Sequence, residues 1–293
     1  MKFVAGDEGE RYTPIRKPFG SELVGNRLYV CDAEGGLHII DLENRTFETW
    51  GLREPGNLVR PINAAVDGDD GFVYVADMGR RQVVVFDRNG EYVRSYGKTG
   101  DFGGPVDVEL HDGKLYVCDV KKHTVHVVDV ESGEVVRTIG SPGSGNSNLF
   151  HPTNICIRND ILYVSDTTNF RVQMFRLNGK PLDRFGAVGT RPGSFARPKG
   201  IAVDREGRVY VADAAFENIQ VFDEQHRLLL YFLRAGNAPG MINLPDGISI
   251  SYDIPQRLRD LVVPGFEAEY LLLVNSQYGL NKINIYAFGK YRK

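Results

Sequence analysis

The stretch LYVSDTTNFRVQMF, residues Leu162–Phe175, begins with a five-residue phrase that recurs along the whole chain. The phrase reads LYVCD or VYVAD where it ends at Asp32, Asp77, Asp119 and Asp213, and a weaker copy, LLLVN, ends at Asn275. Successive aspartates are 42 to 47 residues apart. Self-similarity at this period is typical of β-propellers, in which each repeat forms one four-stranded blade.

Each repeat contains four short runs rich in β-branched and aromatic residues, separated by turn residues, as antiparallel strands require. A proline opens each repeat, at Pro18, Pro61, Pro105, Pro152, Pro198 and Pro245. The six copies predict an all-β, six-bladed propeller of four-stranded antiparallel blades, formed by one domain over residues 1–293. Little chain follows the Ile283–Phe288 run, so we expect Lys2–Ala5 to close the ring as the outer strand of the sixth blade.

Composition places the chain among ordinary globular proteins. It has 293 residues, of which 42% are apolar and 25% charged. The net charge of −3 gives no overall bias toward nucleic acid. No apolar run approaches the roughly 18 residues that a membrane helix needs. The first residues lack the apolar core of a signal peptide, so the chain is expected to be cytoplasmic unless a leader has been removed.

The order of proline, glycine or asparagine, IAV, VYVAD, loop and IQVF resembles the NHL repeat, with Leu162–Phe175 and Arg197–Phe222 as the best copies. The resemblance covers nearly the whole chain and implies the propeller fold. It implies no single function, because similar propellers include peptide-amidating lyases, RNA-binding modules, receptor-type sensors and exported accessory proteins. The stretch NSQYGLNKINIYAFGK also resembles exported bacterial propellers that accompany multihaem cytochromes. That resemblance implies an extracytoplasmic setting and an electron-transfer or envelope protein as partner.

The repeated aspartates are interpreted as scaffold, since a group needed in every blade is better explained by capping of the following loop than by catalysis. Cys31 and Cys118 share their repeat position with Ala76. We interpret this position as a slot for a small side chain and not as half of a redox pair.

Differences between blades in the loops before the prolines and after the YVxD phrases should define a binding surface, because both loops are expected on one face. These loops collect basic and aromatic side chains, and Arg81 and Lys121 are among them. Arg171 is instead expected to brace its own loop. The predicted contacts for a protein or an anionic ligand are Arg60, Arg80, Lys122, His151, Phe170, Arg197, Lys199, Phe216 and Tyr278. The alternative is an ordinary solvated loop surface.

Three polar residues lie two positions after successive prolines: Asn63, Asp107 and Asn154. Their oxygens are weak candidates for a Ca²⁺ site near the axis. Other blades have glycine at this position, and Asn, Asp and Gly together favour a turn with positive φ. We therefore expect no metal and no other cofactor, with Ca²⁺ as the alternative.

The sixth repeat contains an insert, Asp253–Glu269, in which Pro255 is expected to start a short helix. The insert carries five large apolar side chains, Leu258, Leu261, Val262, Val263 and Phe266. Leaving all of them in water is unfavourable. We interpret the insert as a docking element that packs either on this chain's own blades or on a partner, which includes a second copy of the chain.

These features predict a binding or scaffolding propeller that engages a protein or an anionic ligand through the loops around its channel, without catalysis. Two alternatives remain open: a metal-dependent hydrolase or lyase at the channel mouth, and an RNA-binding module. The net acidity argues against nucleic acid as the partner.

Overall fold

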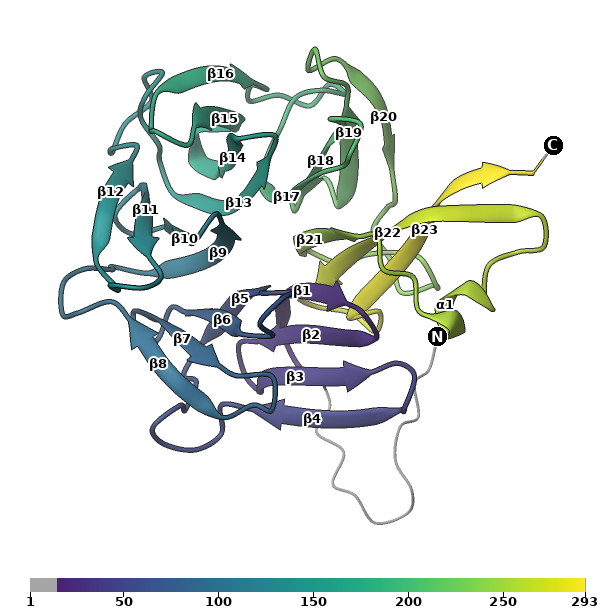
Figure 1. Cartoon of the computed structure of the whole chain (residues 1–293). Helices are drawn as coiled ribbons and strands as arrows, with labels where there is room; N and C mark the ends of the chain where they lie inside the picture. The colour runs from purple at the N-terminus through teal and green to yellow at the C-terminus, as the bar shows by residue number, and fades with distance from the viewer. Residues whose placement is uncertain (1–14, 293) are drawn as a thin grey trace.

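Six β-sheets surround a central axis in the computed structural model, which describes residues 15–292 (Figure 1). The chain builds the sheets in sequence order, and neighbouring strands in each sheet are antiparallel. The predicted six-bladed propeller is therefore confirmed. The predicted closing strand, Lys2–Ala5, lies outside the described residues.

Each of the first five blades has four strands, numbered outward from the axis. Blade 1 contains β1 (Pro18–Val24), β2 (Arg27–Asp32), β3 (Gly36–Asp41) and β4 (Thr46–Trp50). Blade 2 contains β5 (Pro61–Val66), β6 (Val73–Asp77), β7 (Gln82–Phe86) and β8 (Tyr92–Tyr96). Blade 3 contains β9 (Pro105–His111), β10 (Lys114–Asp119), β11 (Thr124–Asp129) and β12 (Val135–Ile139).

Blade 4 contains β13 (Pro152–Arg158), β14 (Ile161–Asp166), the 3₁₀ turn η1 (Thr167–Asn169), β15 (Arg171–Arg176) and β16 (Pro181–Phe185). Blade 5 contains β17 (Pro198–Val203), β18 (Val209–Asp213), β19 (Asn218–Phe222) and β20 (Leu228–Phe232). The described part of blade 6 contains β21 (Pro245–Ser251), β22 (Phe266–Ser276) and β23 (Ile283–Tyr291).

The hydrophobic core lies between the blades. The second strand of a blade is covered on both sides, and all five residues of β6 are buried. One cluster joins Tyr74 of blade 2 to Phe102 and Val117, which belong to the neighbouring blade and its connecting loop. Cys31 and Cys118 are also fully buried, at positions where a larger side chain has no space. Two-sided burial explains why these strands are almost continuously apolar.

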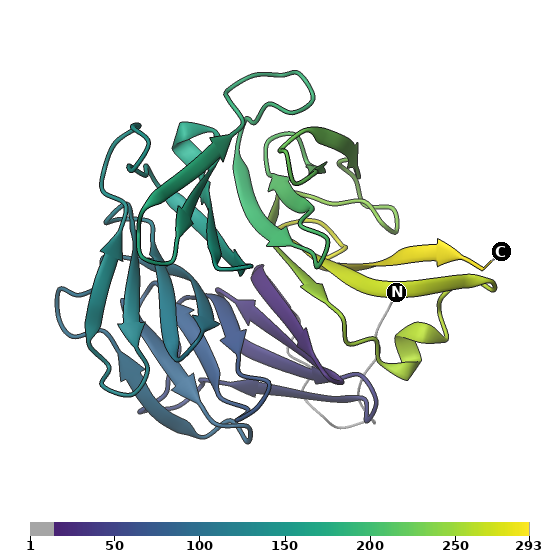
Figure 2. The ribbon, with the colours of Figure 1, turned by 45° about the horizontal axis from the view of Figure 1, so that its top comes forward.

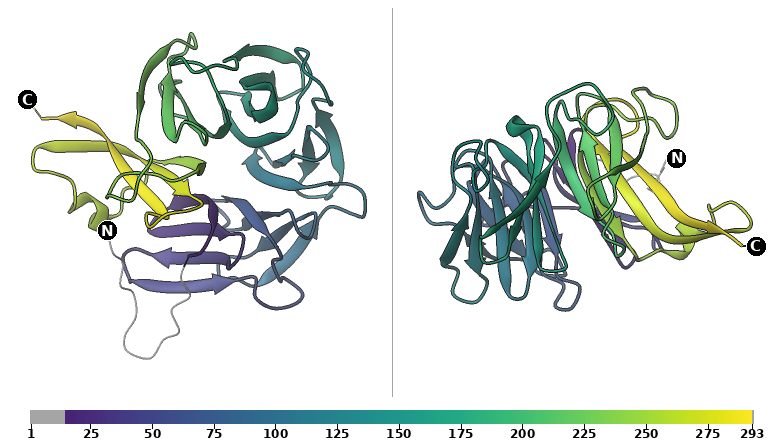
Figure 3. Two further views of the ribbon diagram at one scale, coloured as in Figure 1. Left: turned by 180° about the vertical axis from the view of Figure 1, so that it is seen from behind. Right: turned by 90° about the horizontal axis from the view of Figure 1, so that it is seen from above.

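The insert of blade 6 forms one short helix, α1 (Gln256–Arg259), followed by a long hairpin of β22 and β23 that projects beyond the disc (Figures 2 and 3). Leu258 is buried against Leu23 and Leu28 of blade 1. Val262 and Phe266 are half-buried, whereas Leu261 is 60% exposed and Val263 is 56% exposed. The insert thus anchors itself on this chain through Leu258 and leaves an apolar tip in solvent.

Blades 1 and 6 meet through a set of serine hydrogen bonds that we call the seam. The Ser21 hydroxyl donates to Asn275 Oδ1 (2.8 Å). In return, the hydroxyls of Ser249 and Ser251 donate to the carbonyl oxygens of Ser21 (2.7 Å) and Leu23 (2.8 Å). These contacts join segments more than 220 residues apart in the chain.

No helix among residues 15–292 is long and apolar enough to cross a membrane.

Candidate functional site: the loop face and the channel

The aspartates of the repeated phrase join two loops of each blade at one face of the disc. In blade 2, Asp77 Oδ2 accepts a hydrogen bond from Val59 N (2.6 Å), and its Oδ1 accepts one from Arg60 N (3.0 Å). The backbone N–H groups of Gly79 and Arg80 also donate to Oδ1 (2.9 Å each). Asp32, Asp119 and Asp213 bind the corresponding N–H groups of blades 1, 3 and 5. The predicted capping role is confirmed for these four aspartates, whereas Asp166 binds the side chains of Asn169 and Arg171 in its following loop.

We define the loop face as the two residues before each opening proline and the four residues after each phrase. Several of its predicted binding residues already have partners within the chain. Arg80 donates to the carbonyl oxygens of Pro55 and Asn57, and Lys122 Nζ donates to the carbonyl oxygen of Gly100. Such side chains hold the loops in shape and are less available to a ligand.

Two further basic residues beside the loop face are also engaged. Lys199 Nζ lies 2.8 Å from Asp246 Oδ2 in a largely buried ion pair. Arg171 binds Asp166 (2.8 Å) and three loop carbonyl oxygens, so its predicted role as a loop brace is confirmed. Neither side chain points freely into solvent.

The remaining cations are exposed. Arg60 and Arg197, both predicted contacts, have exposed side chains for which the described residues supply no hydrogen-bond or ion-pair partner. The same holds for Arg16, Arg81 and Lys121. Sequence reasoning preferred Arg80 and Lys122 to the neighbouring Arg81 and Lys121, because only the loop conformation decides which of two adjacent cations turns inward.

Acidic side chains are scarce on the loop face. Within its described residues Glu34 is exposed, whereas Glu217 accepts a hydrogen bond from Leu244 N (2.9 Å). Five exposed cations therefore surround the channel mouth, against one exposed carboxylate. This arrangement favours an anionic partner.

Exposed apolar side chains lie among these cations. Tyr278 is 54% exposed and has Lys17 Nζ 5.4 Å from its ring centre. Val59 and Phe150 are also exposed. Of the other predicted aromatic contacts, Phe170 and Phe216 are half-buried, and Phe170 packs against the core cluster that contains Phe195.

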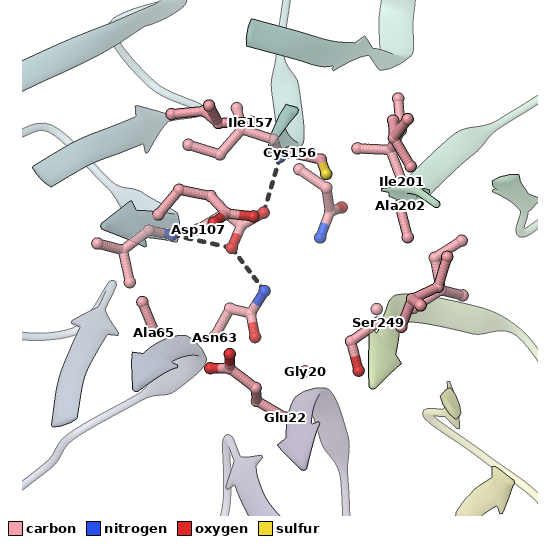
Figure 4. A pocket seen from close by; sticks show the side chains of 18 of the residues that line it. Gly20, Glu22, Asn63, Ala65, Asp107, Cys156, Ile157, Ile201, Ala202 and Ser249 are labelled. Carbon is pink, nitrogen blue, oxygen red and sulfur yellow. Dashed lines mark hydrogen bonds between the residues drawn. The ribbon is translucent and has the colours of Figure 1, made fainter. Parts of the chain in front are cut away.

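The central channel is a second concave site. It forms a cavity of ≈ 240 Å³ lined by the first strands of all six blades. The residue four positions after each opening proline lines this cavity (Figure 4): Glu22, Ala65, Glu109, Cys156, Ala202 and Ser249. Sequence reasoning missed this set, although its signal is the fixed spacing from the proline.

Three carboxyl groups in the channel have altered acidity. Burial raises the pKa of Glu22 to about 7, although a hydrogen bond from Val66 N opposes the rise. Burial also raises the pKa of Asp107 to about 7. Glu109 has its pKa raised well above the ordinary value, first by burial and then by the charges of Asp107 and Glu22. Buried, clustered carboxyl groups resist ionisation because charge is poorly solvated there.

The three candidate Ca²⁺ ligands line the same cavity, and two of them, Asn63 and Asp107, are hydrogen-bonded to each other. Asp107 Oδ1 accepts hydrogen bonds from Asn63 Nδ2 (2.5 Å) and Val108 N (2.9 Å), and its Oδ2 accepts one from Ile155 N (2.7 Å) (Figure 4). Asn63 thus presents its amide nitrogen, which cannot ligate a cation, to the carboxylate. Within residues 15–292, no three His, Cys, Asp or Glu side chains are grouped to hold a metal ion.

The interpretation of these positions as positive-φ turn residues is wrong. None of the six residues two positions after the prolines has a positive φ. They lie in the innermost strands, where neighbouring blades approach most closely. A Cβ atom on Gly20 would collide with the Asn63 side chain, and one on Gly247 would collide with the Phe19 backbone. Glycine is needed there for space, and Asn63 and Asp107 instead bridge their blades.

Comparison with known proteins agrees with the repeat pattern. The family model described as the NHL repeat matches residues 195–222. The chain is a six-bladed β-propeller in which residues 195–222 match the NHL repeat. It is 26% identical over 113 residues to NHL repeat-containing protein 2 of Gallus gallus, which covers 36% of this chain and 14% of that protein. It is also 26% identical over 114 residues to Protein brain tumor of Drosophila melanogaster, covering 38% of this chain and 10% of that protein.

The NHL propeller thus matches only a small part of these relatives' length. Among solved structures it is similar to a streptogramin B lyase, with a TM-score of 0.65 and 12% identity over 96% of this chain and 85% of that chain. Identity at this level shows a shared fold alone.

Proposed function

We propose that this NHL propeller is a non-catalytic binding module that holds an acidic, partly apolar segment of a protein partner on its loop face. The observation that carries the proposal is the set of five exposed cations on the loop face to which residues 15–292 supply no hydrogen-bond or ion-pair partner: Arg16, Arg60, Arg81, Lys121 and Arg197. Val59, Phe150 and Tyr278 lie on the same face and add apolar surface that a purely ionic ligand does not need.

A protein partner suits this face better than a nucleic-acid strand. Binding of single strands depends on aromatic rings whose faces are open for base stacking. Here the ring of Phe150 is stacked on His123 at 4.8 Å, and the ring of Tyr278 lies under Lys17. The overall net charge of −3 also opposes phosphate binding.

The channel offers little support for catalysis. Its one thiol, Cys156, has a pKa raised by burial, which keeps the thiol protonated and poorly nucleophilic. Of the three residues considered for a metal, Asn63 is bonded to Asp107, and Asp107 also accepts from Ile155 N. The extracytoplasmic setting and an electron-transfer or envelope protein as partner remain predictions.

Charge reversal tests the proposal. The probe is a fluorescein-labelled peptide of alternating glutamate and leucine residues, with oligouridine RNA as the competing ligand class. We expect Arg60→Glu, Arg81→Glu and Arg197→Glu together to weaken peptide binding at least about tenfold, which corresponds to about 1.4 kcal/mol. The melting temperature should stay close to that of the unchanged protein, because these side chains make no internal contact.

The matched control reverses three exposed cations outside the loop face, Arg45, Arg176 and Lys180. It changes the net charge equally and should leave peptide binding unchanged. Peptide binding that survives the loop-face reversal would overturn the proposal. Tighter binding of the RNA than of the peptide would do so as well.

A further inference from the structure

The loops before blades 4 and 6 depart from the rule that the other four loops follow, and in blade 6 Leu244 N donates to Glu217 Oε1 of blade 5 (2.9 Å). In blades 1, 2, 3 and 5, the residue before the proline donates its N–H group to the aspartate of its own blade. In blade 4, this residue is His151, and its N–H group donates instead to Nδ1 of His123, which lies in the loop of blade 3 (2.9 Å). A single imidazole therefore ties two neighbouring blades together at the loop face.

Local contacts explain the departure. Asp166 Oδ2 is occupied by Asn169 Nδ2 (2.7 Å) and Arg171 Nε (2.8 Å), and Phe150 N binds Oδ1 (2.6 Å). His151 has turned away into the left-handed region, with φ 52°. This backbone conformation is unfavourable for a residue with a Cβ atom, so the bond to His123 helps to hold it.

The bond defines the protonation state of His123. An imidazole nitrogen accepts a hydrogen bond only when it carries no proton, so His123 must be neutral with its proton on Nε2. The ring is stacked on Phe150 (4.8 Å) and meets His151 edge-on (4.5 Å). Burial and the nearby His151 lower the pKa of His123 below its ordinary value of 6.5, whereas Asp119 and Asp166 oppose this shift.

Two lysines flank His123 on its own loop. Lys122 is held by the carbonyl oxygens of Gly100 and Asp101, and Lys121 is exposed. The charged and titratable groups around the ring are thus two carboxylates, one imidazole and two ammonium groups. The lysines and His151 disfavour a positive charge on His123, whereas the carboxylates of Asp119 and Asp166 favour it. We therefore expect His123 to become protonated at mildly acidic pH.

We propose that protonation of His123 is a switch that releases the blade 4 loop from blade 3. A proton on Nδ1 would face the N–H group of His151, and two donors cannot bond to each other. His151 then leaves the left-handed region, and its N–H group turns toward Asp166 as in the four ordinary blades. The change adds positive charge to the loop face and uncovers one side of Phe150.

The switch belongs to the free protein, and only its effect on a partner rests on the proposed function. The amide of position 151 reports the switch by NMR. The variant His151→Asn removes the titration of that side chain while keeping a residue that tolerates positive φ. Between pH 8 and pH 5 we expect this amide signal to shift with the same midpoint as the ring signals of His123.

The matched variants distinguish this switch from a general effect of pH. His123→Asn keeps an oxygen acceptor and a tolerance of positive φ, but it cannot titrate, so the shift of the position 151 amide should vanish. His226→Asn is the control, because His226 also has a positive φ (61°) and stacks on a phenylalanine ring, at Phe185 (4.6 Å). A shift that persists in the His123→Asn variant, or is absent from the parent, overturns the switch.

Two further measurements complete the test. Crystals of the unchanged protein at pH 8 and pH 5 should show His151 with positive φ only at the higher pH; a positive φ at both overturns the switch. Binding of the glutamate–leucine peptide should be tighter at pH 5.5 than at pH 7.5, and this difference should shrink in the His123→Asn variant. A working switch without any peptide binding would contradict the proposed function alone.

Discussion

Glu22 lies beside the propeller axis, where its carboxyl group is surrounded by neighbouring blades. Its pKa rises from 4.5 to about 7 because burial penalises the charged form more than the hydrogen bond from Val66 N favours it. The folded chain therefore binds a proton that the unfolded chain releases between these two pH values. The stabilisation from this proton is complete below pH 4.5 and is lost as the pH rises through 7.

We predict that Glu22→Gln stabilises the chain at alkaline pH and has little effect at acidic pH. Glutamine keeps an oxygen to accept the bond from Val66 but has no proton to lose. The gain at pH 8.5 should be at most about 3.5 kcal/mol, which is the pKa difference multiplied by about 1.4 kcal/mol per unit. Urea unfolding at pH 5 and pH 8.5 measures it, with Glu131→Gln on the surface as control. A stability difference that is the same at both pH values would contradict the predicted ionisation.

The spacing of elements supports the predicted closing strand. In blades 3, 4 and 5 the outer strand ends 13 residues before the next proline, at Ile139, Phe185 and Phe232. Ala5 precedes Pro18 by the same number of residues.

The outer strand of blade 5 gives a second argument. The third residue of the outer strand is charged in blades 1 to 4, as Glu48, Arg94, Arg137 and Asp183, but it is Leu230 in blade 5. Leu230 shares a face of β20 with Phe232, which contacts Phe288 of blade 6. An apolar residue at this position suits a neighbouring apolar strand such as KFVA.

We therefore predict that deleting Met1–Gly6 lowers the melting temperature by several degrees, because the outer edge of β23 loses its partner. For a chain of this size, 1 kcal/mol corresponds to about 2–4 °C. Calorimetry measures the change, and replacing Lys2 by glutamine in the intact chain controls for the lost positive charge. If the deleted chain melts at the same temperature as the intact one, closure by Lys2–Ala5 is wrong.

Sequence periodicity predicted the strands and the aspartate caps well, because both repeat in every blade and depend on local backbone geometry. It failed where one blade meets another. At the repeat position shared by Gly20 and Asn63, the space between neighbouring blades decides which residue fits. The turn propensity of glycine and asparagine does not reveal this constraint. The inward turn of Lys122 and the outward turn of Lys121 likewise depend on the loop conformation. The tie between His123 and His151 joins two different repeat positions, which also bond as Glu217 and Leu244 between blades 5 and 6, and the repeat pattern alone does not show that these positions meet.

At the scale of the whole molecule, the β22–β23 hairpin and the insert break the outline of the disc. Leu258 fixes the insert to blade 1, and on the adjoining hairpin Lys290 pairs with Glu269 (2.9 Å). The exposed Leu261 and Val263 form an apolar tip. Such a tip favours association with another apolar surface.

We predict that the unchanged chain self-associates through this tip and that Leu261→Ser with Val263→Ser makes it monomeric without lowering its stability. Leu258→Ala is the contrasting variant, because it removes a buried contact and should cost about 2–4 kcal/mol. Light scattering across a concentration series and thermal melting measure the two effects. A complex of unchanged mass in the double-serine variant would show that the tip is not the docking surface.

The serine seam gives the molecule a defined weak line under mechanical load. The first and last blades are joined side by side through the hydrogen bonds of Ser21, Ser249 and Ser251, whereas the strands within each blade follow one another along the chain. A pull on the two ends would therefore act first on the predicted Lys2–Ala5 strand and then on the seam, before it reaches any other boundary between blades. Once the seam has parted, the tension passes to one terminal blade at a time. The chain would then lengthen in a series of steps, and each step would add the unfolded length of about one repeat.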